Sequence, residues 1–139
     1  MWLIGLAGCG HVGAWQIHHG TRQSISGPQD FARVEALGAP SSWVLMIECA
    51  PDGLQLALGG DIEGPSTPVR FDGDPVTLPL RTSRRGVPVI DLRAPISSGT
   101  TTEALLTDAE RLTVHDGVEF DVTDADRAIR RLRCRTVRR

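Results

Sequence analysis

The most constraining feature of this 139-residue sequence is a pair of alternating segments on either side of Asp116-Gly117. Apolar and polar residues alternate over 112–114 and again over 118–122. Asp-Gly is a favoured two-residue connection between antiparallel strands, because both of its residues tolerate positive φ. The sequence therefore predicts a β-hairpin at 112–122, and antiparallel pairing becomes the first expectation for the whole fold.

The middle of the chain supports the same expectation. The continuous apolar run Trp43–Cys49 is typical of a buried central strand, Pro51-Asp52-Gly53 is turn chemistry, and the leucines of 54–58 alternate as a returning strand. Further strands are expected at 2–7, 13–17, 23–25, 69–71, 76–80 and 87–92. Prolines 75, 79 and 88 favour edge positions for the last three of these strands.

Three helices are expected. Gly27-Pro28 begins the first, which covers Pro28–Leu37 with apolar residues at helical spacing, and a brief one follows at 102–109. Thr123 is the expected N-cap of the last helix. Its apolar stripe is Ala125, Ala128, Ile129 and Leu132. The predicted fold is a single α+β domain over 1–139, mainly an antiparallel sheet, with one short helix in the N-terminal half and a C-terminal amphipathic helix.

Composition is that of a soluble globular protein, with 40% hydrophobic and 23% charged residues. The first apolar run lacks a basic flank and is interrupted by glycines, so we expect a cytoplasmic protein without a membrane anchor. Cys9, Cys49 and Cys134 are odd in number and widely spaced, and we expect them to be reduced, buried small residues. The absence of Lys, Asn and Tyr, whose codons are A/T-rich, indicates a gene of high G+C content.

Charge is strongly polarised along the chain. All 15 basic residues are arginines, and seven of them lie within 127–139, where there is no acidic residue. Residues 1–126 carry the other eight arginines and all 17 carboxylates, a balance of −9. Two interpretations stay open: an internal clamp between Arg127, Arg130, Arg131 and the acidic stretch 108–126, or binding of an external acidic ligand. Nucleic acid is disfavoured, because the −9 body would repel phosphates.

Gly8, Gly10 and Gly13 match the G-x-G-x-x-G pattern of dinucleotide-binding loops. Residues 14–20 are too short and poorly patterned for the helix that such a loop requires, and no acidic strand end follows at the ribose-binding distance. A glycine-rich turn between two strands is therefore the preferred interpretation, and nucleotide binding the weaker alternative.

An enzymatic alternative comes from three segments that resemble the start of ribonuclease-H-fold resolvases: Ile4-Gly5-Leu6-Ala7-Gly8, Gly13-Ala14-Trp15 and Met46-Ile47-Glu48. That resemblance implies a nuclease whose carboxylates hold two metal ions. Glu48 with Asp124 or Asp126 would supply the later carboxylates, but Ala7 stands where the family has its first Asp. The four histidines show no metal-binding spacing. Outside the nuclease alternative, neither a metal nor a cofactor is therefore expected.

A binding function is the preferred hypothesis. The helix expected at Pro28–Leu37, the segment Leu56-Ala57-Leu58-Gly59-Gly60, and Glu119-Phe120 leading into the last helix resemble bacterial immunity proteins that neutralise deaminase-type polymorphic toxins. The resemblance implies a non-enzymatic inhibitor whose acidic body faces a basic protein partner. The candidate partner-binding residues are Arg130, Arg131, Arg133, Asp61 and Glu63.

Overall fold

The structure is a computed structural model. It describes residues 9–21, 28–38, 43–51, 53–59, 64–83, 85–114 and 117–134.

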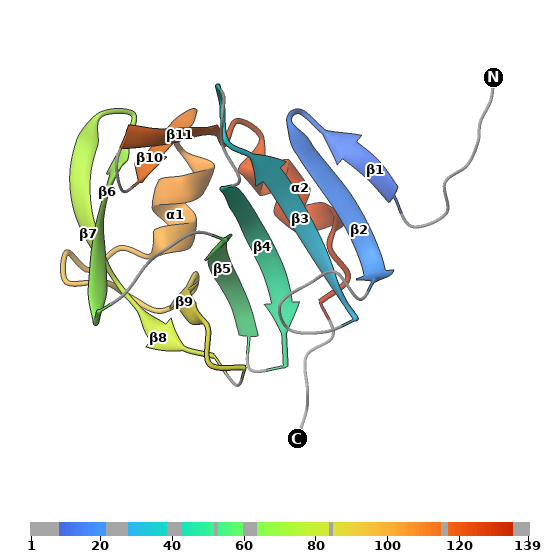
Figure 1. Ribbon diagram of the computed structural model, residues 1–139, viewed down its shortest axis with the longest axis horizontal. Helices are drawn as coiled ribbons and strands as arrows, with labels where there is room; N and C mark the ends of the chain where they lie inside the picture. Colours follow the sequence, from blue (N-terminus) through green and yellow to red (C-terminus); the bar gives the residue numbers. More distant parts are fainter. Residues whose placement is uncertain are drawn as a thin grey trace.

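A seven-stranded antiparallel sheet forms the larger layer (Figure 1). Its strand order is β1-β2-β3-β4-β5-β9-β8, so its first five strands are consecutive hairpins. The strands are β1 (Cys9–Val12), β2 (Trp15–Thr21), β3 (Gln29–Glu35), β4 (Val44–Ala50), β5 (Gly53–Gly59), β8 (Arg81–Thr82) and β9 (Pro88–Asp91). The predicted central strand and its returning partner are confirmed as β4 and β5, which pair from Val44↔Gly59 to Ala50↔Gly53.

A second antiparallel sheet of four strands has the order β11-β10-β6-β7. Its strands are β6 (Ser66–Phe71), β7 (Asp74–Pro79), β10 (Arg111–Val114) and β11 (Val118–Asp121). The hairpin expected at 112–122 is confirmed, with Leu112 opposite Phe120. Pro75 and Pro79 lie on the edge strand β7, as predicted. Pro88 does not lie on an edge strand, because β9 pairs with both β5 and β8; it is the first residue of its strand, where proline is tolerated.

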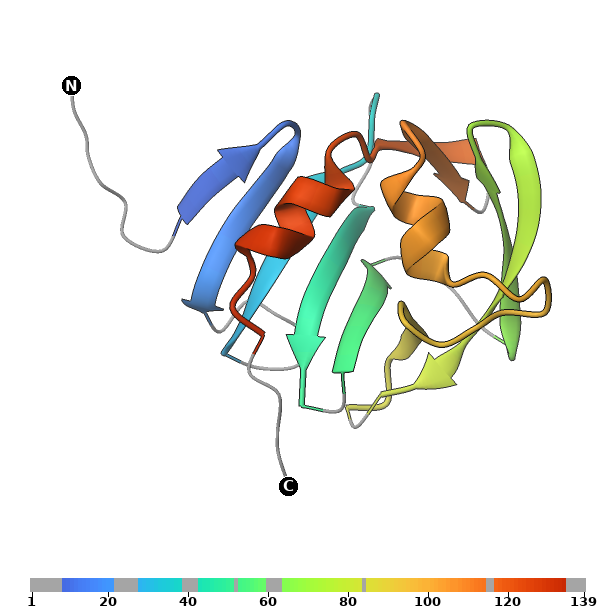
Figure 2. The same ribbon diagram turned by 180° about the vertical axis from the view of Figure 1, so that it is seen from behind.

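Both helices, α1 (Thr102–Thr107) and α2 (Ala125–Arg131), cover the same face of the seven-stranded sheet (Figure 2). The mainly antiparallel α+β fold is therefore confirmed. Helix α1 begins where Thr101 Oγ1 accepts a hydrogen bond from Ala104 N at 3.1 Å. The expected apolar stripe of α2 is buried. The predicted Thr123 cap is wrong: Asp124 is the N-cap residue and makes no side-chain capping bond. No helix in the described ranges is both long and apolar enough to cross a membrane.

The helix predicted at Pro28–Leu37 is wrong, because residues 29–35 form strand β3 between β2 and β4. Phe31 is buried on one face of the sheet, and Ala32 and Val34 are buried on the other. A strand covered on both faces lacks clean alternation of apolar and polar residues. In β3 the apolar residues fall at a spacing that also fits a helix, which is why the sequence predicts a helix here.

One continuous core lies between the helix-covered face of the large sheet, the two helices and the small sheet. Trp15 from β2 and Phe120 from β11 are both fully buried in it. The opposite face of the large sheet carries a smaller buried cluster of Phe31, Met46, Ala57 and Val89. The strands expected at 2–7 and 23–25 lie outside the described residues.

Candidate functional site

A groove of about 530 Å³ lies between the β6–β7 hairpin and α1. Phe71 and Ala109 in its lining are buried, and Val76 and Leu105 are half-buried against the core. The groove is lined by Phe71, Asp72, Asp74, Val76, Thr100, Ala104, Leu105, Thr107, Asp108 and Ala109. The lining therefore combines an apolar floor with three carboxylates, and these described residues include no basic side chain.

The hairpin turn places two of these carboxylates. Phe71 pairs with Asp74, so Asp72 and Gly73 form a two-residue turn in which both have positive φ, 51° and 89°. This combination is the type I′ turn, which Asp-Gly favours. The Asp72 carboxylate accepts hydrogen bonds from Glu110 N at 3.0 Å and Arg111 N at 2.9 Å. Those bonds fix the hairpin against the segment that follows α1, and they leave Asp74 at the groove.

The third carboxylate belongs to Asp108, the exposed C-cap residue of α1. The C-terminal end of a helix carries partial negative charge, which a cation relieves and a carboxylate reinforces. No basic residue occupies the last turn of α1. Within the described part of the chain, neither Asp74 nor Asp108 has an ion-pair partner. The groove therefore offers uncompensated negative charge beside apolar surface.

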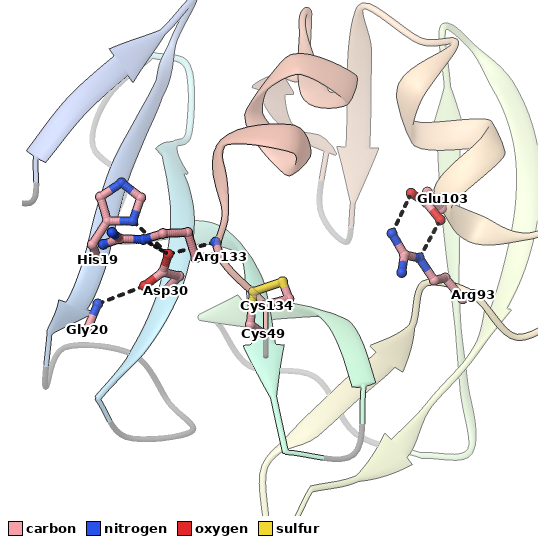
Figure 3. The surroundings of a disulfide bond; sticks show 8 residues. All are labelled: His19, Gly20, Asp30, Cys49, Arg93, Glu103, Arg133 and Cys134. Carbon is pink, nitrogen blue, oxygen red and sulfur yellow. Dashed lines mark hydrogen bonds and ion pairs between the residues drawn. A yellow bond between two sulfur atoms is a disulfide. The ribbon is translucent and has the colours of Figure 1, made fainter. Parts of the chain in front are cut away.

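A second polar cluster is centred on Asp30 of β3, which is only 8% exposed. Its carboxylate accepts hydrogen bonds from His19 Nδ1 at 2.6 Å, Gly20 N at 3.0 Å, and Arg133 N and Nε at 2.7 and 3.4 Å (Figure 3). Burial alone raises the pKa of this carboxyl, but the hydrogen bonds from His19 and Arg133 together hold its pKa below the ordinary value. The cluster joins β2, β3 and the segment after α2.

Beside this cluster, Cys49 of β4 and Cys134 form a disulfide, with Cα atoms 5.0 Å apart. The expectation of reduced cysteines is therefore wrong for this pair. The two residues are 85 positions apart in sequence, and only the fold brings the segment after α2 alongside β4. Cys9 lies at the start of β1 and is not part of the bond.

Two of the three arginines of the internal-clamp interpretation, Arg127 and Arg130, pair with acidic residues of the predicted stretch. Arg127 NH1 lies 3.6 Å from Asp124 Oδ1, and Arg130 pairs with Asp126. Arg133 pairs instead with Asp30, outside the acidic stretch that was expected to hold the tail. Arg131 is exposed and has no ion pair among the described residues.

A third polar network lies on the face of the large sheet opposite the helices. Gln55 Nε2 donates to Glu48 Oε1 at 2.9 Å, and Arg81 bridges Gln55 to Asp91, with its NH2 2.7 Å from Asp91 Oδ1. Glu48 and Gln55 are almost completely buried. The network satisfies polar groups that lie beside the apolar cluster of that face.

The two adjacent histidines of β2 point to opposite faces, as expected for a strand. His18 stacks on Phe31 with ring centroids 4.6 Å apart, whereas His19 bonds to Asp30 on the other face. Burial lowers the pKa of His18, and the charges on Arg33, His11 and His19 lower it further.

The carboxylates of the nuclease alternative are not brought together. Glu48 lies on the face of β4 opposite Ile47, whereas Asp124 and Asp126 belong to α2, which packs on the Ile47 face. In the described ranges there is no group of three or more His, Cys, Asp or Glu that could hold a metal ion. Ala7 lies outside these ranges. The nuclease hypothesis stays a prediction that this placement does not support.

The glycine pattern forms a hairpin. Gly10 lies in β1, Gly13 has φ 58° in the turn, and strand β2 follows directly. The preferred interpretation, a turn between two strands, is confirmed for these residues. Gly8 lies outside the described part of the chain, as do the partner-binding candidates Asp61 and Glu63.

Sequence reasoning missed the residues that form the groove and the Asp30 cluster. Asp30 was assigned to a helix, and its contact with Arg133 spans 103 positions. Asp72-Gly73-Asp74 lies between the strands expected at 69–71 and 76–80, but nothing local places it beside Asp108. Only the type I′ turn could have been found from the dipeptide.

A scan against protein-family models finds no matching family, and no curated protein or solved structure matches the chain.

Proposed function

We propose that this protein is a non-enzymatic protein-binding module whose groove between the β6–β7 hairpin and α1 binds a basic segment of a partner protein. The observation that carries the proposal is the unpaired charge of Asp74 and Asp108 beside the apolar side chains of Phe71 and Leu105. An arginine or lysine fits such a surface, because its aliphatic stem covers apolar atoms while its charged end reaches a carboxylate.

The dimensions of the groove suit a short segment. Its volume of about 530 Å³ lies within the range of typical ligand sites. Exposed carboxylates at such a site speed association with a positively charged partner and make binding sensitive to salt. We therefore expect recognition of one or two basic side chains, with the rest of the interface formed by the surrounding exposed surface.

An immunity or antitoxin-like role remains part of the proposal. It rests on the groove more than on the resemblance, because the helix at Pro28–Leu37 that contributed to the resemblance is strand β3. The structure also bears on the expected cytoplasmic location of the protein. The Cys49–Cys134 disulfide weighs against the expected cytoplasmic location, since disulfides persist mainly in oxidising compartments.

The test compares charge variants in capture from the native host. Asp74→Asn combined with Asp108→Asn removes the two unpaired charges of the groove, keeps Asp72, and leaves side-chain size almost unchanged. The proposal expects wild-type protein to capture a stoichiometric, basic protein, and the double variant to bind the same purified protein about tenfold more weakly, as expected when two exposed charge pairs are lost. Affinity is measured by calorimetry at two salt concentrations, and the difference between variant and wild type should shrink at high salt.

The matched control is Glu35→Gln combined with Glu119→Gln. Both glutamates are exposed and lie outside the groove, and their replacement changes the net charge equally. Binding by this control should stay close to wild type. Equal weakening in both double variants would mean that only overall charge matters, and unchanged binding in the groove variant would exclude the groove as the site.

A further inference from the structure

We propose that Cys134 is a thiol-exchange site, and that the Cys49–Cys134 disulfide is a clasp which an external dithiol opens to release the arginine-bearing segment after α2. The clasp is separate from the groove: it joins the end of α2 to β2, β3 and β4, whereas the groove lies between α1 and the small sheet. Its chemistry requires no partner in the groove.

The backbone after α2 leads directly into the clasp. Leu132 leaves the helix in an extended conformation, with φ −81° and ψ 137°, and its side chain is buried. Arg133 N then donates to Asp30, and the next residue, Cys134, is bonded to Cys49 (Figure 3). Two attachments therefore hold two consecutive residues against the sheet, one ionic and one covalent.

The two cysteine residues differ in exposure, which determines where exchange begins. Cys134 is an exposed residue, whereas Cys49 is 4% exposed on the helix-covered face of β4. Exchange needs an attacking thiolate to reach one sulfur along an open approach. A thiolate from solvent therefore attacks Sγ of Cys134, and Cys49 is the leaving group.

The reaction balances with a dithiol as the reductant. The first thiolate forms a mixed disulfide with Cys134 as the original S–S bond breaks, and Cys49 leaves as a thiolate that takes up a proton. The second thiol of the reductant then attacks the reductant's first sulfur, which is bonded to Cys134 in the mixed disulfide. This step releases Cys134, which takes up a proton to become a thiol. Two electrons pass to the protein, and the dithiol is oxidised to a disulfide.

When the disulfide is open, neither Cys49 nor Asp30 is left in an unfavourable environment. Cys49 becomes a buried thiol, which packs as a small apolar residue. Asp30 loses Arg133 but keeps its hydrogen bonds from His19 and Gly20, so its carboxylate is not stranded without donors. Opening the clasp is therefore compatible with a folded sheet.

Release stops at Leu132. The apolar stripe of α2 is buried in the main core, and none of its residues takes part in the disulfide. Arg133 and Cys134 are the described residues that lose their attachments, and three further arginines follow them in the sequence. Reduction thus separates the backbone and guanidinium of Arg133 from Asp30 and makes this basic residue available to an acidic ligand.

The site of exchange is tested on the folded, oxidised protein with reduced glutathione as the probe. After brief exposure, free thiols are blocked with iodoacetamide and the modified cysteines are located by peptide mapping, which also separates Cys9. We expect glutathione on Cys134 and the iodoacetamide adduct on Cys49. Glutathione on Cys49, or no reaction until the protein is unfolded, would overturn the proposal.

Release is tested by amide hydrogen exchange of the same protein before and after reduction by dithiothreitol. The Arg133 amide should exchange at least about tenfold faster after reduction, because its bond to Asp30 opens. The Ala128 amide, bonded to Asp124 O at 3.0 Å inside α2, should be unchanged. Unchanged Arg133 exchange would show that the clasp does not hold the segment, and faster Ala128 exchange would show that the whole helix detaches.

Two serine variants provide an independent check. Cys134→Ser removes the clasp at an exposed position and should show the fast Arg133 exchange without any reductant. Cys9→Ser leaves the disulfide intact and should behave as wild type in both states. A slow Arg133 amide in Cys134→Ser would contradict the proposal even if the chemistry of exchange were as expected.

Discussion

Asp30 is the residue whose environment most depends on the complete fold. Its carboxylate is almost buried, and a buried charge is tolerated only when donors replace the lost water. Donors come from β2 through His19 and Gly20, and from the segment after α2 through Arg133. The residue therefore reports on three separate parts of the chain.

The lowered pKa of Asp30 predicts a loss of stability in acid. The unfolded carboxyl titrates near 3.8 and the folded one lower, so between these values the unfolded state binds more protons. The contribution of Asp30 to the free energy of unfolding is complete above about 3.8 and falls as the pH drops through the folded pKa. Asp30→Asn should cost about 1–3 kcal/mol at neutral pH, and the difference from wild type should shrink in acid.

Urea unfolding of both proteins across this pH range measures that difference. Subtracting the variant is necessary because Asp121 also has a lowered pKa: burial raises it, but hydrogen bonds from Thr123 and the charge of Arg111 outweigh burial. A difference between Asp30→Asn and wild type that does not change with pH would mean that Asp30 does not titrate differently in the folded state.

At the scale of elements, local patterns predicted the strands and helices whose apolar residues alternate, form one stripe, or follow one another without a break as in β4. Strand β6 alternates exposed and buried residues from Ser66 to Phe71, and α2 buries one stripe, so both could be predicted from periodicity. Strand β3 has buried residues on both faces, and its apolar spacing indicated a helix instead. Pairing with β2 and β4 decides its structure, and that pairing leaves no local signal.

The start of α2 supplies a prediction about backbone conformation. Asp124 has φ 67°, in the left-handed region that costs residues with a Cβ about 1–2 kcal/mol relative to glycine. Its pair with Arg127 is exposed and long, at 3.6 Å, and is worth little. We expect Asp124→Ala to be less stable than Asp124→Gly by about 1 kcal/mol, measured as the difference in free energy of unfolding.

Wild type should lie close to Asp124→Gly, because aspartate tolerates the left-handed conformation better than most residues. If both variants lost the same stability relative to wild type, the Asp124 carboxylate would make a contribution beyond backbone conformation. That contribution would come from contact with the neighbouring Gly13 turn, where an added Cβ would lie 3.1 Å from Asp124 Oδ2.

At the scale of the molecule, the sequence predicted charge but not its placement. The sequence shows an acidic body followed by a basic stretch at 127–139, and it predicts an internal partner for Arg127 and Arg130, which the structure provides. The groove could not be predicted, because Asp74 and Asp108 are 34 positions apart and meet only where the β6–β7 hairpin packs on α1. The disulfide was missed for the same reason, since its residues are 85 positions apart.

The two sheets share one core, and this predicts that they unfold together. Phe120 of the small sheet is fully buried with residues of the large sheet, and Leu37 N, just after β3, donates to Glu119 O at 2.8 Å. Phe120→Ala should lower the free energy of unfolding by about 3–5 kcal/mol through lost burial and the cavity left behind. Leu37→Ala is the control: Leu37 is 44% exposed, so its truncation should cost within about 0.5 kcal/mol.

Two probes test whether the transition is shared. With Trp2 and Trp43 replaced by Phe, tryptophan fluorescence reports on Trp15 in the large sheet, and amide signals of β6 and β10 report on the small one. In Phe120→Ala the two probes should give the same, lowered denaturation midpoint, as expected for one cooperative unit. If the β6 and β10 signals disappeared at a lower denaturant concentration than the fluorescence change, the small sheet would be a separate folding unit and the expectation of a single domain would be wrong.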